Sequence, residues 1–373
     1  MNANIKYCFE DIVKNFALGG SFVKSEPYGF GHINDTYAIY FIMPNGEMKR
    51  FILQRVNNGV FKNPEKLMEN IQSVTSFLRK KIINNGGNPE RETLNLIPTL
   101  DGKSFYKSDD GDYWRLYVFI EGAQTYQVVE KPEHFYNAGR AFGNFQKLLS
   151  DYPAESLYET IQNFHNTKVR FDTFVNAVEK DVMNRAKDVK QEINFAQERY
   201  DEAVLLVSML EKGELPLRVT HNDTKFNNVM IDDKTGEGIC VIDLDTVMPG
   251  LALYDFGDAI RFGTNPAAED EKDLSKVWMD IGLYEQFTKG FLGAAGDSLT
   301  NAELLHLPHS AKIMTYECGI RFLTDYLVGD TYFKIHREGH NLDRCRTQFT
   351  LVADMENKFE QMQKIVINDV QIK

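Results

Sequence analysis

The stretch HNDTKFNN (221–228) decides the fold class, because its spacing fits the catalytic-loop pattern H-x-D-x-x-x-x-N. In that pattern the Asp accepts the proton of an attacking hydroxyl group. The Asn five residues later binds a divalent metal ion on nucleotide phosphates, and a tight loop brings both side chains into one cleft. We therefore predict that Asp223 is a catalytic base and that Asn228 is a metal ligand.

A second acidic residue follows at the distance that this pattern requires. Asp243 ends an apolar segment about 20 residues after Asp223. The residues between them predict a hairpin, with apolar runs at 229–231 and 239–242. Such a hairpin would return Asp243 to the same metal ion, so we predict Asp243 as the second ligand. Asp245 remains the alternative ligand, and a simple turn or cap role remains open for it.

A glycine-rich segment, GFGHIN (29–34), precedes the first predicted strand. It is similar to a phosphate-binding loop, although it ends in Asn where the kinase pattern has Gly, and a plain turn is the alternative interpretation. We predict that Gly29, Gly31 and Asn34 contact the nucleotide.

The strand predicted at 51–56 lacks the Lys that kinase-type lobes place there. Arg55 is the cation near its end, and a guanidinium offers a planar fork of donors for phosphate. We predict that Arg55 pairs with Glu69, with Glu65 as the alternative, although all three can equally be solvated surface residues. Whether Arg55 or Gln54 contacts the phosphates stays open.

The order of predicted elements indicates two lobes. Strands at 38–43 and 50–56 flank an Asn-Gly turn, a helix follows at 63–81, and two further strands lie near Phe105 and at 114–120. The last strand would be a hinge whose backbone, at Ile120 and Glu121, binds adenine. Long helical patterns then dominate from 133 onward, interrupted by short strands at 217–220, 229–232 and 239–244.

We therefore predict an α+β, two-lobed, protein-kinase-like fold. Residues 1–121 would form a nucleotide-binding lobe with a small antiparallel sheet and one helix. Residues 122–373 would form a larger, mainly helical lobe for catalysis and substrate binding. ATP would bind between the lobes together with Mg²⁺.

Composition limits the partners. The chain has 373 residues and a net charge of -12, which argues against nucleic-acid binding, because that affinity comes mainly from Lys and Arg. No apolar run reaches the roughly 18 residues of a membrane span. The N-terminal segment lacks the pattern of a signal peptide, so we expect a cytoplasmic protein. The four scattered cysteines are expected to be reduced, and no heptad pattern predicts an oligomer, so we expect a monomer.

The chain resembles the aminoglycoside phosphotransferase/choline kinase superfamily and, more narrowly, bacterial N-acetylhexosamine 1-kinases. The resemblance spans nearly the whole chain. It is carried by FGHINDTY (30–37), FILQRVN (51–57), VFKNPEKLMENI (60–71), VTHNDTKFNNV (219–229) and VIDLDTVMPGLALYDFGDAIRFG (241–263).

The resemblance implies an ATP-dependent kinase that phosphorylates N-acetylglucosamine or N-acetylgalactosamine at the anomeric hydroxyl. It implies sugar contacts for His32, Arg321 and Tyr332, beside the base Asp223. It also implies that Asp255 supports the backbone of the catalytic loop, with a helix N-cap as the alternative role.

Two other functions stay open. The same fold could phosphorylate another small alcohol, such as choline, homoserine, methylthioribose or an aminoglycoside. The chain could also be an inactive pseudokinase that only binds nucleotide. A peptide substrate is disfavoured, because no DFG or APE segment is present.

Overall fold

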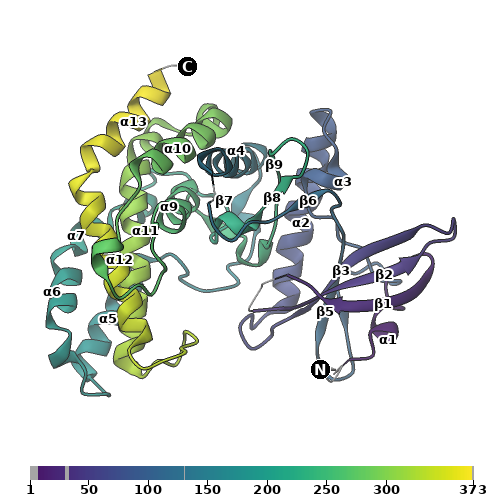
Figure 1. The fold of residues 1–373 in the computed structure, drawn as a ribbon, viewed down its shortest axis with the longest axis horizontal. Helices are drawn as coiled ribbons and strands as arrows, with labels where there is room; N and C mark the ends of the chain where they lie inside the picture. The colour runs from purple at the N-terminus through teal and green to yellow at the C-terminus, as the bar shows by residue number, and fades with distance from the viewer. Residues whose placement is uncertain (1–6, 30–32, 130, 372–373) are drawn as a thin grey trace.

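The computed structural model describes residues 7–29, 33–129 and 131–371 (Figure 1). A β-sheet lies at one end of the molecule, and most of the helices lie at the other end. The predicted α+β arrangement of a small antiparallel sheet and a larger helical part is therefore confirmed.

The sheet runs antiparallel in the strand order β1-β2-β3-β5-β4. The strand bounds are Ser21–Pro27 (β1), Asp35–Ile42 (β2), Met48–Val56 (β3), Tyr106–Lys107 (β4) and Tyr113–Val118 (β5). The predicted hairpin between β2 and β3 is confirmed, and its turn places Gly46 at a φ of +81°, which glycine adopts without steric cost. Strand β1 was not predicted, because this edge strand exposes most of its side chains and lacks an alternating apolar pattern.

Two helices accompany the sheet. Helix α1 (Phe9–Val13) shares a buried core with β2, β3 and β5 that includes Trp114. Helix α2 (Pro64–Asn84) follows β3 and buries its apolar stripe in the larger core of the molecule. The helix predicted at 63–81 is thus confirmed, but it continues for three further residues because Ile82 extends the buried stripe.

Of the other helices, α3 (Pro89–Glu92) lies between β3 and β4 in the chain, and the rest follow β5. They are α4 (Pro132–Leu148), α5 (Thr167–Lys180), α6 (Lys190–Glu198), α7 (Tyr200–Ala203), α8 (Leu205–Glu211), α9 (Ala252–Gly263), α10 (Ile281–Ala295), α11 (Asn301–Val328), α12 (His340–Asn357) and α13 (Phe359–Gln371). None of the helices in the described residues combines the length and the apolar character needed to cross a membrane.

Short strands frame the segment 221–246. Strand β6 (Ala123–Gln124) pairs with β8 (Val229–Asp232), and β8 pairs with β9 (Gly238–Val241), which confirms the predicted hairpin. Strand β7 (Arg218–Thr220) pairs with β10 (Met248–Gly250). Sequence analysis missed β10, because its central Pro and final Gly are unfavourable in strands.

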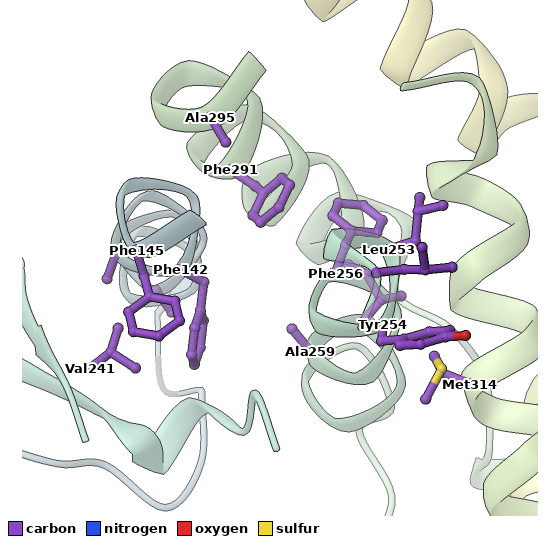
Figure 2. Close-up of a cluster of buried hydrophobic side chains, with 14 of the residues drawn as sticks. Phe142, Phe145, Val241, Leu253, Tyr254, Phe256, Ala259, Phe291, Ala295 and Met314 are labelled. Atoms are coloured by element: carbon purple, nitrogen blue, oxygen red, sulfur yellow. The ribbon is translucent and has the colours of Figure 1, made fainter. Parts of the chain in front are cut away.

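The main core lies among α4, α9, α10 and α11 (Figure 2). Phe142 of α4, Phe256 of α9 and Phe291 of α10 belong to this cluster, and the last two rings meet edge to face at 5.4 Å. This packing fixes α9, whose first turn carries Asp255.

Glycines allow α4 and α10 to touch backbone to backbone. A Cβ atom at Gly290 would lie 2.1 Å from the carbonyl oxygen of Tyr136, and one at Gly139 would lie 2.4 Å from that of Phe287. Side chains larger than hydrogen would therefore separate the two helices.

We predict that Gly290→Ala lowers the free energy of unfolding by about 1–3 kcal/mol, because the added methyl group collides with backbone rather than with a movable side chain. Gly293→Ala in the same helix is the matched control, since a Cβ atom there meets nothing within 4 Å. That control should gain about 0.5–1 kcal/mol from the lower entropy of the unfolded chain. Denaturant unfolding followed by circular dichroism measures both, and equal effects would contradict the helix contact.

Candidate active site

A cavity of about 360 Å³ has walls from both the sheet and the segment 223–246. The three residues predicted to carry the chemistry, Asp223, Asn228 and Asp243, all line this one cavity. The 20 residues that separate the two acids in the sequence are thus folded back by the β8–β9 hairpin.

The catalytic-loop segment follows β7 and ends in the short helix η3 (Phe226–Asn228). The side-chain amide of Asn228 donates to the Asp223 carbonyl oxygen at 2.8 Å and to its Oδ2 at 3.3 Å. Lys225 Nζ lies 2.8 Å from Asp223 Oδ1. The loop therefore gathers an amide, a carboxylate and an ammonium group at one wall of the cavity.

Asp223 is held in its charged form. Burial alone favours the protonated acid, but the positive charges of Lys225 and Arg261 outweigh it and hold the pKa of Asp223 below its usual value. An ionised carboxylate is the form that accepts a proton. Lys225 stays protonated, because Asp223 raises its pKa.

Asp255 supports the backbone of this loop. Its Oδ2 accepts from His221 N at 3.0 Å, and its Oδ1 accepts from Asn222 N at 2.8 Å. Gln146 Nε2 also donates to Oδ2, at 2.6 Å. The supporting role expected for Asp255 is confirmed, and the N-cap role is wrong, since Leu251 is the N-cap of α9.

Asp243 follows β9 in a left-handed conformation, with a φ of +59°. The pKa of Asp243 is raised to about 6, first by burial and then by the negative charges of Asp245 and Asp223. A third carboxylate beside two others is unfavourable unless a cation neutralises them. The carboxylate and amide oxygens around this wall are the ligands that hard divalent cations prefer.

The buried cation of the cavity is Arg115 of β5, which sequence analysis missed. Its side chain is 1% exposed, forms an ion pair with Asp245 and donates through Nε to Gln54 Oε1 at 3.0 Å. Asn34 Nδ2 donates to the other oxygen of Asp245 at 2.5 Å. A charged residue within the apolar run WRLYV was the signal in the sequence, because a strand buries such a charge only beside a partner.

The predicted pair of Arg55 and Glu69 is wrong. Arg55 instead binds Asp35 and Asp112, at 2.7 and 3.0 Å. Neighbouring residues of a strand point to opposite faces, so Gln54 lines the cavity while Arg55 lies on the other face of the sheet. Glu69 is exposed and does not line the cavity.

The structure places the remaining nucleotide residues in two groups. Gly29, Asn34 and Ile120 line the cavity, whereas Gly31 and His32 lie outside the described residues. Glu121 does not line it.

The carboxylate of Glu121 accepts from Arg50 at 2.8 and 2.7 Å, and its carbonyl oxygen accepts from Arg91. The protein therefore already occupies these acceptors of Glu121.

Arg321 and Tyr332 lie together but outside the lining of this cavity. The guanidinium carbon of Arg321 lies 5.5 Å from the ring centroids of Phe164 and Phe333, and 5.9 Å from that of Tyr332. Tyr332 is 65% exposed. Asp325 fixes the position of this loop, since its carboxylate accepts from the backbone of Thr331, Tyr332 and Phe333.

The sequence profile of the phosphotransferase enzyme family matches residues 29–279. An aminoglycoside phosphotransferase from Alicyclobacillus acidocaldarius has a similar structure, with a TM-score of 0.62, 11% identity and coverage of 100% of this chain and 98% of that chain. A spectinomycin phosphotransferase in complex with ADP and spectinomycin has a TM-score of 0.56 and 13% identity, with coverage of 95% of this chain and 98% of that chain. A choline kinase from Cryptosporidium parvum has a TM-score of 0.56 and 14% identity, with coverage of 96% of this chain and 97% of that chain.

These comparisons confirm the resemblance to the aminoglycoside phosphotransferase/choline kinase superfamily and its kinase-like fold. A curated relative, a subtilisin-like protease from Coccidioides posadasii (strain C735), is 26% identical over 142 residues, which is 36% of this chain. The chain matches about a third of that relative's length, 35%, and the activity in its name is that protein's own.

We predict that Asp255→Asn lowers the free energy of unfolding on the order of 3 kcal/mol. Both oxygens of Asp255 accept hydrogen bonds from backbone N–H groups. In Asn the NH2 group replaces one oxygen, so it would face a backbone N–H donor and lose that hydrogen bond. Asp280→Asn is the matched control: Asp280 accepts from Gly282 N and Leu283 N through a single oxygen, which Asn retains.

Denaturant unfolding and hydrogen exchange at His221 and Asn222 measure this effect. Faster exchange at both amides in Asp255→Asn, with unchanged exchange in Asp280→Asn, is the expected result. Equal stability of the two variants would contradict the support role.

Proposed function

The chain belongs to the phosphotransferase enzyme family, and we propose that it is an ATP- and Mg²⁺-dependent kinase for N-acetylhexosamines. Asp223, Asn228 and Asp243 on one cavity wall are the observation that carries this proposal. The proposed product is the sugar 1-phosphate.

We propose that residues 1–121 and 122–373 act as the two lobes around ATP. The cavity supports this division, since its walls come from both parts of the chain. Gly29, Gly31 and Asn34 would cover the phosphates, and the backbone near Ile120 and Glu121 would bind adenine. Because Arg91 already binds the Glu121 carbonyl oxygen, neighbouring backbone groups would supply the remaining adenine contacts.

Asn228 and Asp243 would hold the metal ion. When bound, Mg²⁺ would supply charge neutralisation on the phosphate oxygens. The raised pKa of Asp243 supports a cation at this place, because its charge repels those of Asp245 and Asp223. Arg115 already neutralises Asp245, which favours Asp243 over Asp245 as the ligand.

Asp223 would take the proton of the sugar hydroxyl as that oxygen attacks the γ-phosphorus atom. The bond between the γ-phosphorus and the bridging oxygen breaks, and ADP leaves. Lys225, beside Asp223, would offset charge on the transferred group. An anomeric hydroxyl is more acidic than an ordinary alcohol, so an ionised carboxylate with a lowered pKa suffices as base.

The charge near Arg321 supports a neutral sugar over a cationic acceptor. The pKa of Arg170 is lowered by burial and by the like charge of Arg321. Two guanidinium groups would repel choline or an aminoglycoside. The aromatic rings around Arg321 would suit the apolar face of a sugar.

A substrate panel with coupled ADP detection tests the acceptor. We expect turnover with N-acetylglucosamine and N-acetylgalactosamine, and none with their methyl glycosides, which lack the anomeric hydroxyl. Phosphorus NMR should show the product phosphate coupled to the anomeric proton. Turnover with choline, homoserine, methylthioribose or an aminoglycoside would instead identify another small-alcohol kinase. ATP binding without turnover would identify a pseudokinase.

We predict that Asp223→Asn lowers kcat about 10²- to 10⁴-fold, because the amide cannot accept the proton. ATP affinity and the unfolding midpoint should stay close to wild type. Asp233→Asn, an exposed residue of the β8–β9 turn, is the control with the same chemical change. Wild-type turnover in Asp223→Asn would remove Asp223 from the mechanism.

A further inference from the structure

Behind the catalytic loop, a buried His–Glu pair contacts the peptide that precedes the base. We propose that His165 is a positioning residue, which holds the carbonyl oxygen of Asn222 as a charged imidazolium bound on its other side by Glu317. The proposal rests on the proposed function, in that it assigns the pair to Asp223.

Both ring nitrogens of His165 face oxygen acceptors. Nδ1 lies 2.8 Å from Glu317 Oε1, and Nε2 lies 3.4 Å from the Asn222 carbonyl oxygen. A carbonyl oxygen only accepts, so Nε2 must carry a hydrogen to bond with it. An ionised Glu317 also only accepts, so Nδ1 must carry one too. Two N–H groups make the ring a cation.

Glu317 is ionised in this setting. Burial alone would raise the pKa of its carboxyl group, but His165, Arg321 and Thr167 together lower it. Thr167 Oγ1 donates to the second oxygen at 2.7 Å, so each oxygen has a donor. Glu317 is 1% exposed and His165 is 9% exposed, so the charges are shielded from water. A buried pair of this kind is tolerated when its remaining polar atoms are bonded.

The neighbouring His221 shows the opposite pattern. Its Nε2 faces the Ile242 carbonyl oxygen at 2.8 Å, but its Nδ1 accepts from Asp223 N at 3.3 Å. One nitrogen donates and the other accepts, which is the neutral ring. The two histidines of this region therefore carry different charge because their partners differ.

The contact of His165 matters because Asn222 has an unusual backbone. Its φ of +65° lies in the left-handed region, which a non-glycine residue keeps only when its surroundings fix it. Its N–H binds Asp255, and its side-chain amide donates to the Thr246 carbonyl oxygen at 2.9 Å. His165 Nε2 faces its main-chain carbonyl oxygen.

The Asn222 carbonyl and the Asp223 N–H belong to the same planar peptide. A hydrogen bond that fixes this oxygen therefore also fixes the orientation of the peptide plane that contains the Asp223 nitrogen. A small displacement of a reacting group, on the order of 1 Å, can cost about 100-fold in rate. The His165–Glu317 pair thus acts on the reaction only through the position of Asp223.

Other charged groups surround the pair. The Tyr254 ring from α9 lies 5.2 Å from the His165 ring, and burial keeps that phenol protonated by raising its pKa. Arg321, one turn after Glu317 in α11, and Arg170 of α5 both interact with the Glu317 charge. These two cations also favour the ionised form of Glu317, and they oppose the imidazolium less than Glu317 stabilises it, because Glu317 touches the ring.

The test uses His165→Phe, which keeps the ring shape without donors, and Glu317→Gln, which keeps an acceptor for Nδ1 without the charge. His309→Phe is the matched control, since His309 lies on the same helix as Glu317 and its ring meets the Phe359 ring edge to face at 4.8 Å. Long-range ¹H–¹⁵N NMR of histidine-labelled protein at pH 7 reports the charge of each ring. The signals absent from His165→Phe are assigned to His165.

We expect both nitrogens of His165 to give imidazolium shifts in the wild type and neutral-ring shifts in Glu317→Gln. Hydrogen exchange of the peptide containing 221–224 should become faster in both variants and stay unchanged in His309→Phe. With N-acetylhexosamine, kcat should fall about 10- to 100-fold, while the KM values for ATP and sugar stay within about threefold.

Neutral-ring shifts for His165 in the wild type would overturn the proposal, as would unchanged exchange at 221–224 in His165→Phe. So would a fall in both kcat and loop order in His309→Phe equal to that in His165→Phe. If the wild type shows no activity on any acceptor, the proposed function fails. The NMR and exchange results then still decide the positioning role on their own.

Discussion

The carboxylate of Asp255 is the constraint on which the candidate site depends. It lies buried in the first turn of α9, and three donors share its two oxygens. Burial raises the pKa of the Asp255 carboxyl group, and the three hydrogen-bond donors counteract this by stabilising the ionised form, in which both oxygens accept. The backbone contact of α4 with α10 at Gly139 and Gly290 sets the spacing of the main core among α4, α9, α10 and α11. The packing of four helices thereby fixes two amides of one loop.

Charges of both signs alternate around the cavity. Lys225 holds Asp223 ionised, and Arg115 neutralises Asp245, but no protein cation in the described residues forms an ion pair with Asp243. Asp243 therefore has a raised pKa, whereas the neighbouring Asp223 and Asp245 each have a cationic partner. Asn34 and Arg115 reach Asp245 from the sheet side, so the same acid also links the sheet to the loop of the candidate site. The same hydrogen bonds therefore shape the candidate site and join the two parts of the molecule.

Local patterns predicted what depends on neighbours in the chain. The H-x-D-x-x-x-x-N spacing, the apolar runs around 232–236 and the Asn-Gly turn are short-range signals, and each led to the observed loop or hairpin. The pairing of Arg55 with Glu69 failed because it rested on the absence of Lys from a strand. Register decides which residue of that strand faces the cavity, and Gln54 does. Edge strand β1 was missed because its side chains lack the alternation that a half-buried strand shows, and the short β10 was missed because Pro and Gly are unfavourable in strands.

By itself, the sequence determined the class of chemistry, because the acids and the amide that it requires lie within a loop and one hairpin of each other. It also determined the arrangement of a sheet followed by a mainly helical part, since the apolar periodicities of strands and helices can be recognised within short windows of the sequence. Only the tertiary structure decided which cations serve those acids. Arg115 and Asp245 are 130 positions apart, and His165 lies 152 positions from Glu317. Contacts at such separations follow from packing and burial, which no local pattern encodes.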